Sequence, residues 1–130
     1  MPGEELWPGA RAADAPYTPG LRVGDTVYVS GQVPVDPATR RVVEGEFEDR
    51  VRQCLANVEA VLRAGGASLA DVVKVTVFLT DMNNFARLNA VYSGYWAGTR
   101  PTRSCVQVAR LPLDVDVEIE AIAMRGGRAG

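Results

Sequence analysis

The segment RPTRSCVQVARLP, residues 100–112, places an arginine and a cysteine two positions apart where a β-strand is expected to begin. Alternate side chains of a strand share a face, so Arg103, Cys105 and Gln107 project together. A guanidinium binds both oxygens of a carboxylate, whereas a cysteine thiol needs an activating group before it acts as a nucleophile. The pattern indicates a binding arginine and leaves the role of Cys105 open.

A second set of polar side chains lies in the sequence VEIE near the C-terminus. Residues 114–125 alternate so regularly that Asp116, Glu118 and Glu120 share one face of a strand. If this strand and the Arg103 strand are antiparallel neighbours, a guanidinium and one or two carboxylates face the same cavity. The alternative is a structural or surface ion pair of Arg103 with Glu118 or Glu120.

The composition excludes several kinds of site. The chain has no histidine, which removes histidine-based triads and most catalytic zinc sites. The two cysteines, Cys54 and Cys105, are expected as free thiols, and Cys54 falls in an apolar helical stripe where a buried role is expected. The sequence contains neither the dinucleotide-binding motif GxGxxG nor the phosphate-binding motif GxxxxGK[ST]. We therefore expect no metal and no cofactor.

Charge and hydropathy limit the partners. The 14 basic and 16 acidic residues are scattered and give a formal net charge of −2, so nucleic-acid binding is not expected. The chain has no apolar run long enough to span a membrane, and its first residues lack the apolar core of a signal peptide. No membrane association is expected, and the cytoplasm is the expected location.

The length of 130 residues and the 47% hydrophobic content suit one domain over residues 1–130. Residues 1–15 are predicted as an irregular arm and residues 126–130 as a flexible tail. The predicted elements are a hairpin over 20–32 that turns at Gly24-Asp25, a short strand at 40–43, a helix from Glu46 to Gly65, a strand over 72–80, a helix from an Asp81/Asn83 cap to Trp96, and strands over 104–110 and 114–125.

This element order predicts an α+β sandwich in which two helices cover one face of a mixed sheet of about six strands. The opposite face would present apolar side chains: Tyr28, Val72, Phe78, Ile122 and Met124. Large exposed apolar patches are rare on monomers, so we expect this face to be buried by association of several copies. A pocket bounded by Arg103 and Glu118 is then expected between subunits.

Four segments carry a resemblance to a known family: VYVSGQVPVDP (27–37), DVVKVTVFLTDMNNFARLNAVY (71–92), RPTRSCVQVARLP (100–112) and VEIEAIA (117–123). They resemble the YjgF/RidA family of reactive intermediate deaminases. The resemblance implies a chorismate-mutase-like fold and a homotrimer with its sites at the subunit interfaces. It also implies hydrolysis of enamines and imines, such as 2-aminoacrylate or 2-iminobutyrate, to a 2-keto acid and ammonia without a cofactor or metal.

The resemblance also implies roles for single residues. Arg103 matches the arginine that binds the substrate carboxylate, and Glu118 matches the carboxylate that positions the attacking water. The remaining matches are pocket positions, namely Tyr17 as a lining tyrosine, Ser30, Gly31 and Asn89 as residues that shape or support the pocket, and Cys105 as a cysteine whose backbone helps to hold the water or substrate.

Each pocket position has a structural alternative. Tyr17 would cap the hairpin core, Asn89 would be a helix-surface amide, and Ser30 and Gly31 would serve only strand-end geometry. For Cys105, the absence of histidine and of a nearby lysine favours a purely structural role for the thiol. The segment PYTPG around Tyr17 also departs from the PYSQA pattern usual in the family, which bears on substrate choice.

Three further functions stay open at this stage. One is a specialised member that processes an imine or enamine in a biosynthetic pathway. Another is a non-enzymatic protein that binds a small metabolite in the same clefts. An RNA-directed activity is the third, and the scattered charge argues against it.

Overall fold

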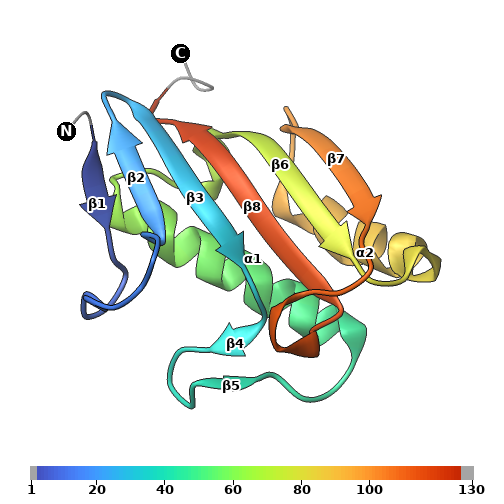
Figure 1. The fold of residues 1–130 in the computed structure, drawn as a ribbon. Helices are drawn as coiled ribbons and strands as arrows, with labels where there is room; N and C mark the ends of the chain where they lie inside the picture. The colour runs from blue at the N-terminus through green and yellow to red at the C-terminus, as the bar shows by residue number, and fades with distance from the viewer. Residues whose placement is uncertain (1–2, 127–130) are drawn as a thin grey trace.

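The structure is a computed structural model, and it describes residues 3–126 of the chain. The main sheet is built from β1 (Glu4–Leu6), β2 (Gly20–Val23), β3 (Thr26–Gln32), β6 (Val72–Leu79), β7 (Thr102–Gln107) and β8 (Val117–Met124). Its strand order is β1-β2-β3-β8-β6-β7, and β7 runs parallel to β6. The helices α1 (Phe47–Ala64) and α2 (Phe85–Tyr92) lie on one face of the sheet (Figure 1), which confirms the predicted α+β architecture.

The connections add smaller elements. A two-stranded sheet pairs β4 (Val35–Asp36) with β5 (Arg41–Val42), which is the short strand predicted near residue 42. Single 3-10 turns are η1 (Leu69–Asp71), η2 (Met82–Asn84), η3 (Ser93–Tyr95) and η4 (Pro112–Asp114). The predicted hairpin is also present, because β2 and β3 pair antiparallel and turn at Gly24-Asp25.

The helix α1 covers the core of the sheet. Its apolar side chains recur every three or four residues and are all buried: Phe47, Val51, Cys54, Leu55, Val58, Val61 and Leu62. Burial of a Val or Leu side chain contributes about 1.5–3 kcal/mol, so this stripe holds α1 on the sheet. The helix ends where predicted, and Gly66 takes the left-handed φ of 78° that glycine tolerates best.

The N-terminal segment differs from the predicted irregular arm. Glu4–Leu6 forms an edge strand antiparallel to β2, and Leu6 is only 2% exposed. Leu6 fills the space beside Gly20 and Gly65, where an added Cβ would meet its atoms at 3.2 and 2.7 Å. Three residues with one apolar side chain give too short a pattern for a strand to be predicted. Of the predicted tail, Gly126 is described and residues 127–130 lie outside the described residues.

A bulge in β6 corrects the placement of Val72. This residue was expected on the sheet face opposite the helices, but it is fully buried in the core. The pairing with β8 shifts between Val72 and Lys74, which breaks the alternation that then continues through Val75 and Val77. The sequence of this apolar run does not show where such an extra residue is inserted.

The strand β7 is not a neighbour of β8, because β6 lies between them. The condition under which Arg103 and Glu118 would share a cavity within one chain is therefore not met. The cause is the helical crossover, since a strand joined to the next through α2 returns parallel to it. The strand is also shifted from the predicted range 104–110 to Thr102–Gln107.

The second helix is shorter than its apolar spacing predicts. Asp81 accepts a hydrogen bond from the backbone N–H of Asn83, as the predicted cap requires, but α2 ends at Tyr92. The chain continues as the turn η3, and Trp96 is still buried, with its indole N–H donating to the Leu69 carbonyl at 2.7 Å. The aromatic side chains keep their predicted place in the core although the helix has stopped.

The face of the sheet opposite the helices carries apolar side chains that are open to solvent in the single chain. Tyr28, Val106 and Met124 are 45%, 42% and 38% exposed, and Phe78 and Ile122 are half-buried. Apart from Val72, the apolar residues predicted for this face are present on it. We refer to Tyr28, Phe78, Val106, Ile122 and Met124 as the open face.

Candidate active site

The predicted site residues form two groups on opposite faces of the sheet. The first group surrounds a cleft of about 450 Å³ on the face away from the helices, lined in part by Tyr17, Ser30 and Glu120. Gly31 and Glu118 adjoin it, since Gly31 follows Ser30 in β3 and Glu118 precedes Glu120 by two residues in β8. We refer to these five residues as the Glu118 half-site.

A bulge in β3 shapes the Glu118 half-site. The pairing of β3 with β8 shifts between Val29 and Gln32, so Ser30 and Gly31 leave the regular ladder. A Cβ on Gly31 would overlap the Glu118 carboxylate, so the absence of a side chain at position 31 gives that carboxylate its place. For Ser30 and Gly31, the sequence left open whether they shape a pocket or serve only the geometry of the strand end. In the structure the same bulge does both.

The loop that carries Tyr17 is fastened to the same bulge. The Ser30 hydroxyl donates to the Thr18 carbonyl at 2.7 Å, and the Ser30 backbone N–H donates to the Pro19 carbonyl at 2.8 Å. The Tyr17 side chain itself is 62% exposed, so it does not cap the hairpin core. Its phenol stands beside the cleft and is free to contact a ligand.

The Glu118 carboxylate is half-buried and has no hydrogen-bond or ion-pair partner within residues 3–126. Burial raises its pKa above the ordinary value, and the negative charge of Glu120 raises that pKa further. An unpaired carboxyl with a raised pKa beside a cleft is characteristic of a residue that exchanges protons with a substrate or water.

The second group lies on the helix side, at the edge formed by β7. Its cleft of about 370 Å³ is lined by Asn89, Tyr92, Ser93, Trp96, Arg100, Pro101 and Arg103. We refer to these seven residues as the Arg103 half-site. The half-buried Asn89 therefore borders a cleft and is not simply a surface amide of α2.

Arg103 lies among aromatic rings and away from carboxylates. Its guanidinium carbon is 4.7 Å from the ring centroid of Tyr92 and 5.5 Å from that of Phe85. No ion pair with Glu118 or Glu120 forms within the described residues, so that alternative for Arg103 is wrong for the single chain. The guanidinium lies over these two rings, and its N–H groups have no hydrogen-bond partner among the described residues.

The two thiols are poor nucleophiles. Cys105 is half-buried against the core beside Arg103 on β7, and burial raises the pKa of its thiol, an effect that the charge of Arg103 only partly offsets. Cys54 is buried inside α1, burial raises the pKa of its thiol strongly, and its sulfur lies 3.7 Å from the Val117 carbonyl. If Cys105 contributes to a site, it does so through its backbone N–H and carbonyl groups and not through its thiol.

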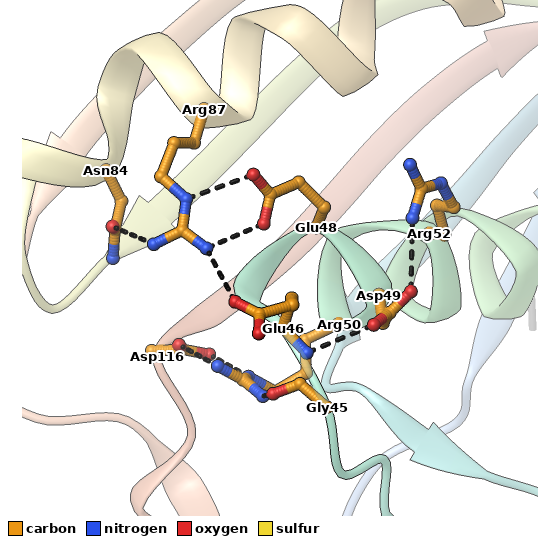
Figure 2. A network of polar contacts seen from close by, with 9 residues as sticks. All are labelled: Gly45, Glu46, Glu48, Asp49, Arg50, Arg52, Asn84, Arg87 and Asp116. Atoms are coloured by element: carbon orange, nitrogen blue, oxygen red, sulfur yellow. Dashed lines mark hydrogen bonds and ion pairs between the residues drawn. The ribbon is translucent and has the colours of Figure 1, made fainter.

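Ion pairs at the start of α1 hold the strand that carries Glu118 (Figure 2). Asp116 accepts hydrogen bonds from Nε and Nη2 of Arg50 at 2.8 and 2.9 Å, and Nη1 of Arg50 donates to the Gly45 carbonyl at 2.9 Å. The Arg50 and Asp116 side chains are only 21% and 27% exposed. This two-pronged contact fixes β8 two residues before Glu118.

A second ion pair joins the two helices in the same network. Arg87 of α2 donates to both carboxylate oxygens of Glu48 at 3.0 and 2.7 Å, and it lies 3.4 Å from Glu46 (Figure 2). The hydrogen bonds from Arg87 lower the pKa of Glu48 to about 2. The helix that borders the Arg103 half-site is thereby fastened to the helix that supports Glu118.

Sequence reasoning did not assign site roles to Tyr92, Trp96 and Arg100. The first two were predicted in the apolar stripe of a helix; both are buried, but only Tyr92 is helical, since Trp96 follows the turn η3. A usable signal was present for Tyr92, because it follows Asn89 by three residues on one helix face, whereas Arg100 lies outside a helix and its spacing from Arg103 gave no such signal.

The two half-sites do not meet within one chain. Arg103 pairs with Val75 in the register of β6 and shares its helix-facing side, whereas Glu118 pairs with Phe78 on the other side. One half-site offers an unpaired guanidinium and the other an unpaired carboxyl, which together could bind and hydrate a small carboxylate ligand. Residues 3–126 contain no cluster of metal-ligating side chains and no helix suited to crossing a membrane.

Known proteins resemble this chain over most of its length. Residues 9–125 match the family model described as Endoribonuclease L-PSP. A 2-iminobutanoate/2-iminopropanoate deaminase of Salmonella typhimurium is 50% identical over 119 residues, which is 89% of this chain and 92% of the relative. A RutC family protein of Pyrococcus horikoshii is 48% identical over 110 residues, or 85% and 87% of the two chains.

Solved structures agree with these sequence relatives. Escherichia coli TdcF with bound serine superposes with a TM-score of 0.85 at 46% identity, over 94% of this chain and 98% of that one. The E. coli YjgF gene product gives a TM-score of 0.84 at 45% identity, over 92% and 96% of the two chains. A family model that spans nearly the whole chain, with relatives close to half identical in sequence and alike in fold, shows that the chain belongs to the YjgF/RidA family.

Proposed function

We propose that this protein hydrolyses small 2-imino acids and their enamine tautomers, such as 2-iminobutyrate and 2-aminoacrylate, to 2-keto acids and ammonia. The observation that supports the proposal is that Arg103 and Glu118, the two residues to which the family resemblance assigns the chemistry, have no ion-pair or hydrogen-bond partner among the described residues. The names of relatives that are about half identical to the chain support the same reaction. The bound serine of TdcF is a small amino acid of comparable size.

The complete site is proposed to form between subunits of a homotrimer. Arg103 and Glu118 lie on opposite faces of the sheet, so a second copy has to bring one half-site to the other. The open face supplies an apolar surface for this contact, because Tyr28 and Val106 remain more than two-fifths exposed in the single chain. Assembly would therefore bury the open face and complete the site in one step.

In the proposed reaction, Arg103 binds the substrate carboxylate through its planar fork of N–H groups. Glu118 takes a proton from a water molecule while the water oxygen bonds to the imine carbon, and it delivers that proton to the imine nitrogen to give a carbinolamine. Glu118 then takes the hydroxyl proton of the carbinolamine and passes it to the amine, so that the C–N bond breaks, ammonia leaves and the C=O bond of the 2-keto acid forms. A raised pKa suits Glu118 to both proton transfers, and general acid or base catalysis of this kind contributes about 10²–10⁴-fold.

The other predicted residues would act around this centre. Tyr17 would cover the substrate from the exposed side of the Glu118 half-site, and the Ser30–Gly31 bulge would keep the carboxylate in place. Asn89 would border the substrate beside Arg103, and the backbone at Cys105 would help to hold the water or the substrate.

A coupled assay tests the proposal. A pyridoxal-phosphate lyase generates 2-aminoacrylate or 2-iminobutyrate, and the release of keto acid is timed with and without the protein. We expect Arg103→Ala and Glu118→Gln to lose most of the acceleration, whereas Arg110→Ala, which removes an exposed arginine paired with Asp114, should retain it. Full activity of the Arg103→Ala protein would refute the assigned site.

The same assay separates the remaining functions. Absence of acceleration with every small imine would favour a non-enzymatic protein that binds metabolites in these clefts. Acceleration with one pathway imine alone would indicate a specialised biosynthetic member. The description of the family model also calls for an RNA-cleavage control, which we expect to be negative given the net charge of −2.

A further inference from the structure

The Arg103 half-site holds more positive charge than a single substrate carboxylate requires. Arg100 and Arg103 line the same cleft, together with the amide of Asn89 and the hydroxyl of Ser93. No carboxylate lines this cleft among the described residues, and neither arginine forms an ion pair there. The lining thus includes two arginines and two residues with neutral hydrogen-bonding groups, and no carboxylate among the described residues.

Unpaired arginines also occur elsewhere among the described residues, but Arg41, for example, lines a cleft that contains the carboxylates of Asp36 and Glu44, whereas the cleft of Arg100 and Arg103 contains none. Arg50, Arg87 and Arg110 each donate to both oxygens of one carboxylate. Two like charges in one cleft repel each other, and an anion bound between them relieves the repulsion. The pair Arg100 and Arg103 is therefore set to bind negative charge from outside the chain.

The size of the cleft also exceeds the smallest proposed substrates. A volume of 370 Å³ accommodates about twelve groups the size of a water molecule. 2-Iminopropanoate has roughly half that number of non-hydrogen atoms, so a longer side chain fits beside it. The apolar part of the lining, which includes Trp96 and Pro101, suits the methylene groups of such a side chain.

The backbone sets the two arginines apart. A proline disfavours helical backbone in the residue before it, so Arg100 is expected to be extended, and three extended residues would separate the α-carbons of Arg100 and Arg103 by about 10 Å. Their side chains reach one cleft from separate points, which suits two anionic groups on one ligand better than one group held by both.

We propose that Arg100 determines specificity by binding a second carboxylate, so that the preferred substrates are 2-imino dicarboxylates of four or five carbons. Arg103 holds the carboxylate next to the imine, and Arg100 holds the one at the far end of the side chain. The proposal rests on the proposed deaminase function and adds a substrate class to it. Hydrolysis is balanced as before: the C=N bond is replaced by C=O, with water consumed and ammonia released.

The test compares acidic and neutral imines generated in place. Amino-acid oxidases produce the imines of glutamate and of 2-aminobutyrate, and a semicarbazide trap reports how much of each escapes hydrolysis. We expect a higher kcat/KM for the acidic imine in the unaltered protein and a fall of about tenfold or more in the acidic-to-neutral ratio for Arg100→Gln. An unchanged ratio in that variant would overturn the assignment.

The control variant is Arg40→Gln, which removes the same charge from the exposed β4–β5 turn and should leave the ratio unchanged. Titration with 2-oxoglutarate and 2-oxobutyrate separates this inference from the deaminase function. If no imine is hydrolysed faster but 2-oxoglutarate binds more tightly and loses that advantage in Arg100→Gln, the dianion site stands and the reaction does not. Equal binding of both keto acids would overturn the dianion site.

Discussion

At the scale of single residues, the site depends on contacts that are absent as much as on those made. Gly31 lacks a side chain where a Cβ would overlap Glu118, and Glu118 itself has no partner within residues 3–126. The one buried side-chain polar atom of the described residues without a hydrogen bond is the hydroxyl of Tyr92, the residue whose ring lies under the Arg103 guanidinium. Unpaired polar groups are costly, so their presence around these two residues favours a functional explanation.

We expect Gly31→Ala to lower kcat/KM by about ten- to a hundredfold, because the new methyl group displaces the Glu118 carboxylate. The φ of Gly31 lies outside the left-handed region, so the backbone accepts alanine and the thermal unfolding midpoint should change little. Gly9→Ala is the matched control, since an added Cβ there meets nothing within 4 Å. Equal activity of the two variants would show that position 31 does not place Glu118.

The pH dependence tests the role of Glu118. As a base it must be ionised, so activity falls as the pH drops through its pKa, which the charge of Glu120 helps to raise. Glu120→Gln should therefore move the acid limb of the kcat/KM profile to lower pH, whereas Glu44→Gln, an exposed change elsewhere, should not. A limb that stays in place would exclude coupling between the two glutamates.

The same raised pKa affects stability in a defined direction. The folded state binds the Glu118 proton more tightly than the unfolded state, so stability falls as the pH rises from the ordinary pKa through the raised one. The site thus costs the fold some stability under conditions in which Glu118 is ionised.

At the scale of elements, β8 and β3 are the strands that place the Glu118 half-site. The start of β8 is fixed by the Arg50–Asp116 contact, and the β3 bulge opens the space into which the Glu118 carboxylate extends. Parallel pairing of β7 with β6 places Arg103 at the sheet edge beside α2. Each half-site therefore depends on how strands pair, which is decided outside the strand that carries the functional side chain.

Asp116→Asn should lower the free energy of unfolding by about 1 kcal/mol or more, because it leaves the mostly buried Arg50 without its charged partner. It should also reduce deamination, since β8 is released two residues before Glu118. Chemical denaturation and the coupled assay measure the two effects. Asp114→Asn makes the same change in an exposed pair and should show neither, and a similar loss in both variants would contradict this reasoning.

At the scale of the whole molecule, the single chain has two incomplete half-sites and one exposed apolar face. The proposed assembly through the open face would explain these features together, because a contact that buries apolar area would also bring Arg103 of one copy toward Glu118 of another. Catalysis would then depend on protein concentration wherever the assembly dissociates.

Mixing two inactive variants tests this directly. Arg103→Ala and Glu118→Gln proteins, co-assembled in equal amounts, should recover about a quarter of the normal activity, because each intersubunit site draws its arginine and its glutamate from different copies at random. Sedimentation measures the assembly and the coupled assay measures the activity. Recovery of no activity in mixed assemblies would place both residues of a site in one chain.

Several features of the fold could be predicted because they depend on neighbours in the chain. The spacing of Val51, Leu55 and Val58 marks the buried side of α1, and the alternation of β8 separates Glu118 from Ile119. Where the pattern is short or interrupted, the prediction was wrong: the strand β1 and the bulge beside Val72 were not predicted. The family motifs indicated Arg103 and Glu118 but carried no information about Arg100.

The sequence by itself determined the α+β class, the inward and outward sides of α1 and β8, and the family, because local periodicity and motif identity survive without coordinates. Only the tertiary structure decided that Arg103 and Glu118 lie on opposite sides of the sheet, and that Arg100 and Arg103 share one cleft. The physical reason is that strand order, bulges and the choice of the helix-covered face arise from packing between distant segments. The opening pair in RPTRSCVQVARLP is therefore a guanidinium on the helix side of the sheet beside a half-buried thiol, and under the proposed assembly the carboxylate of Glu118 would come from another copy.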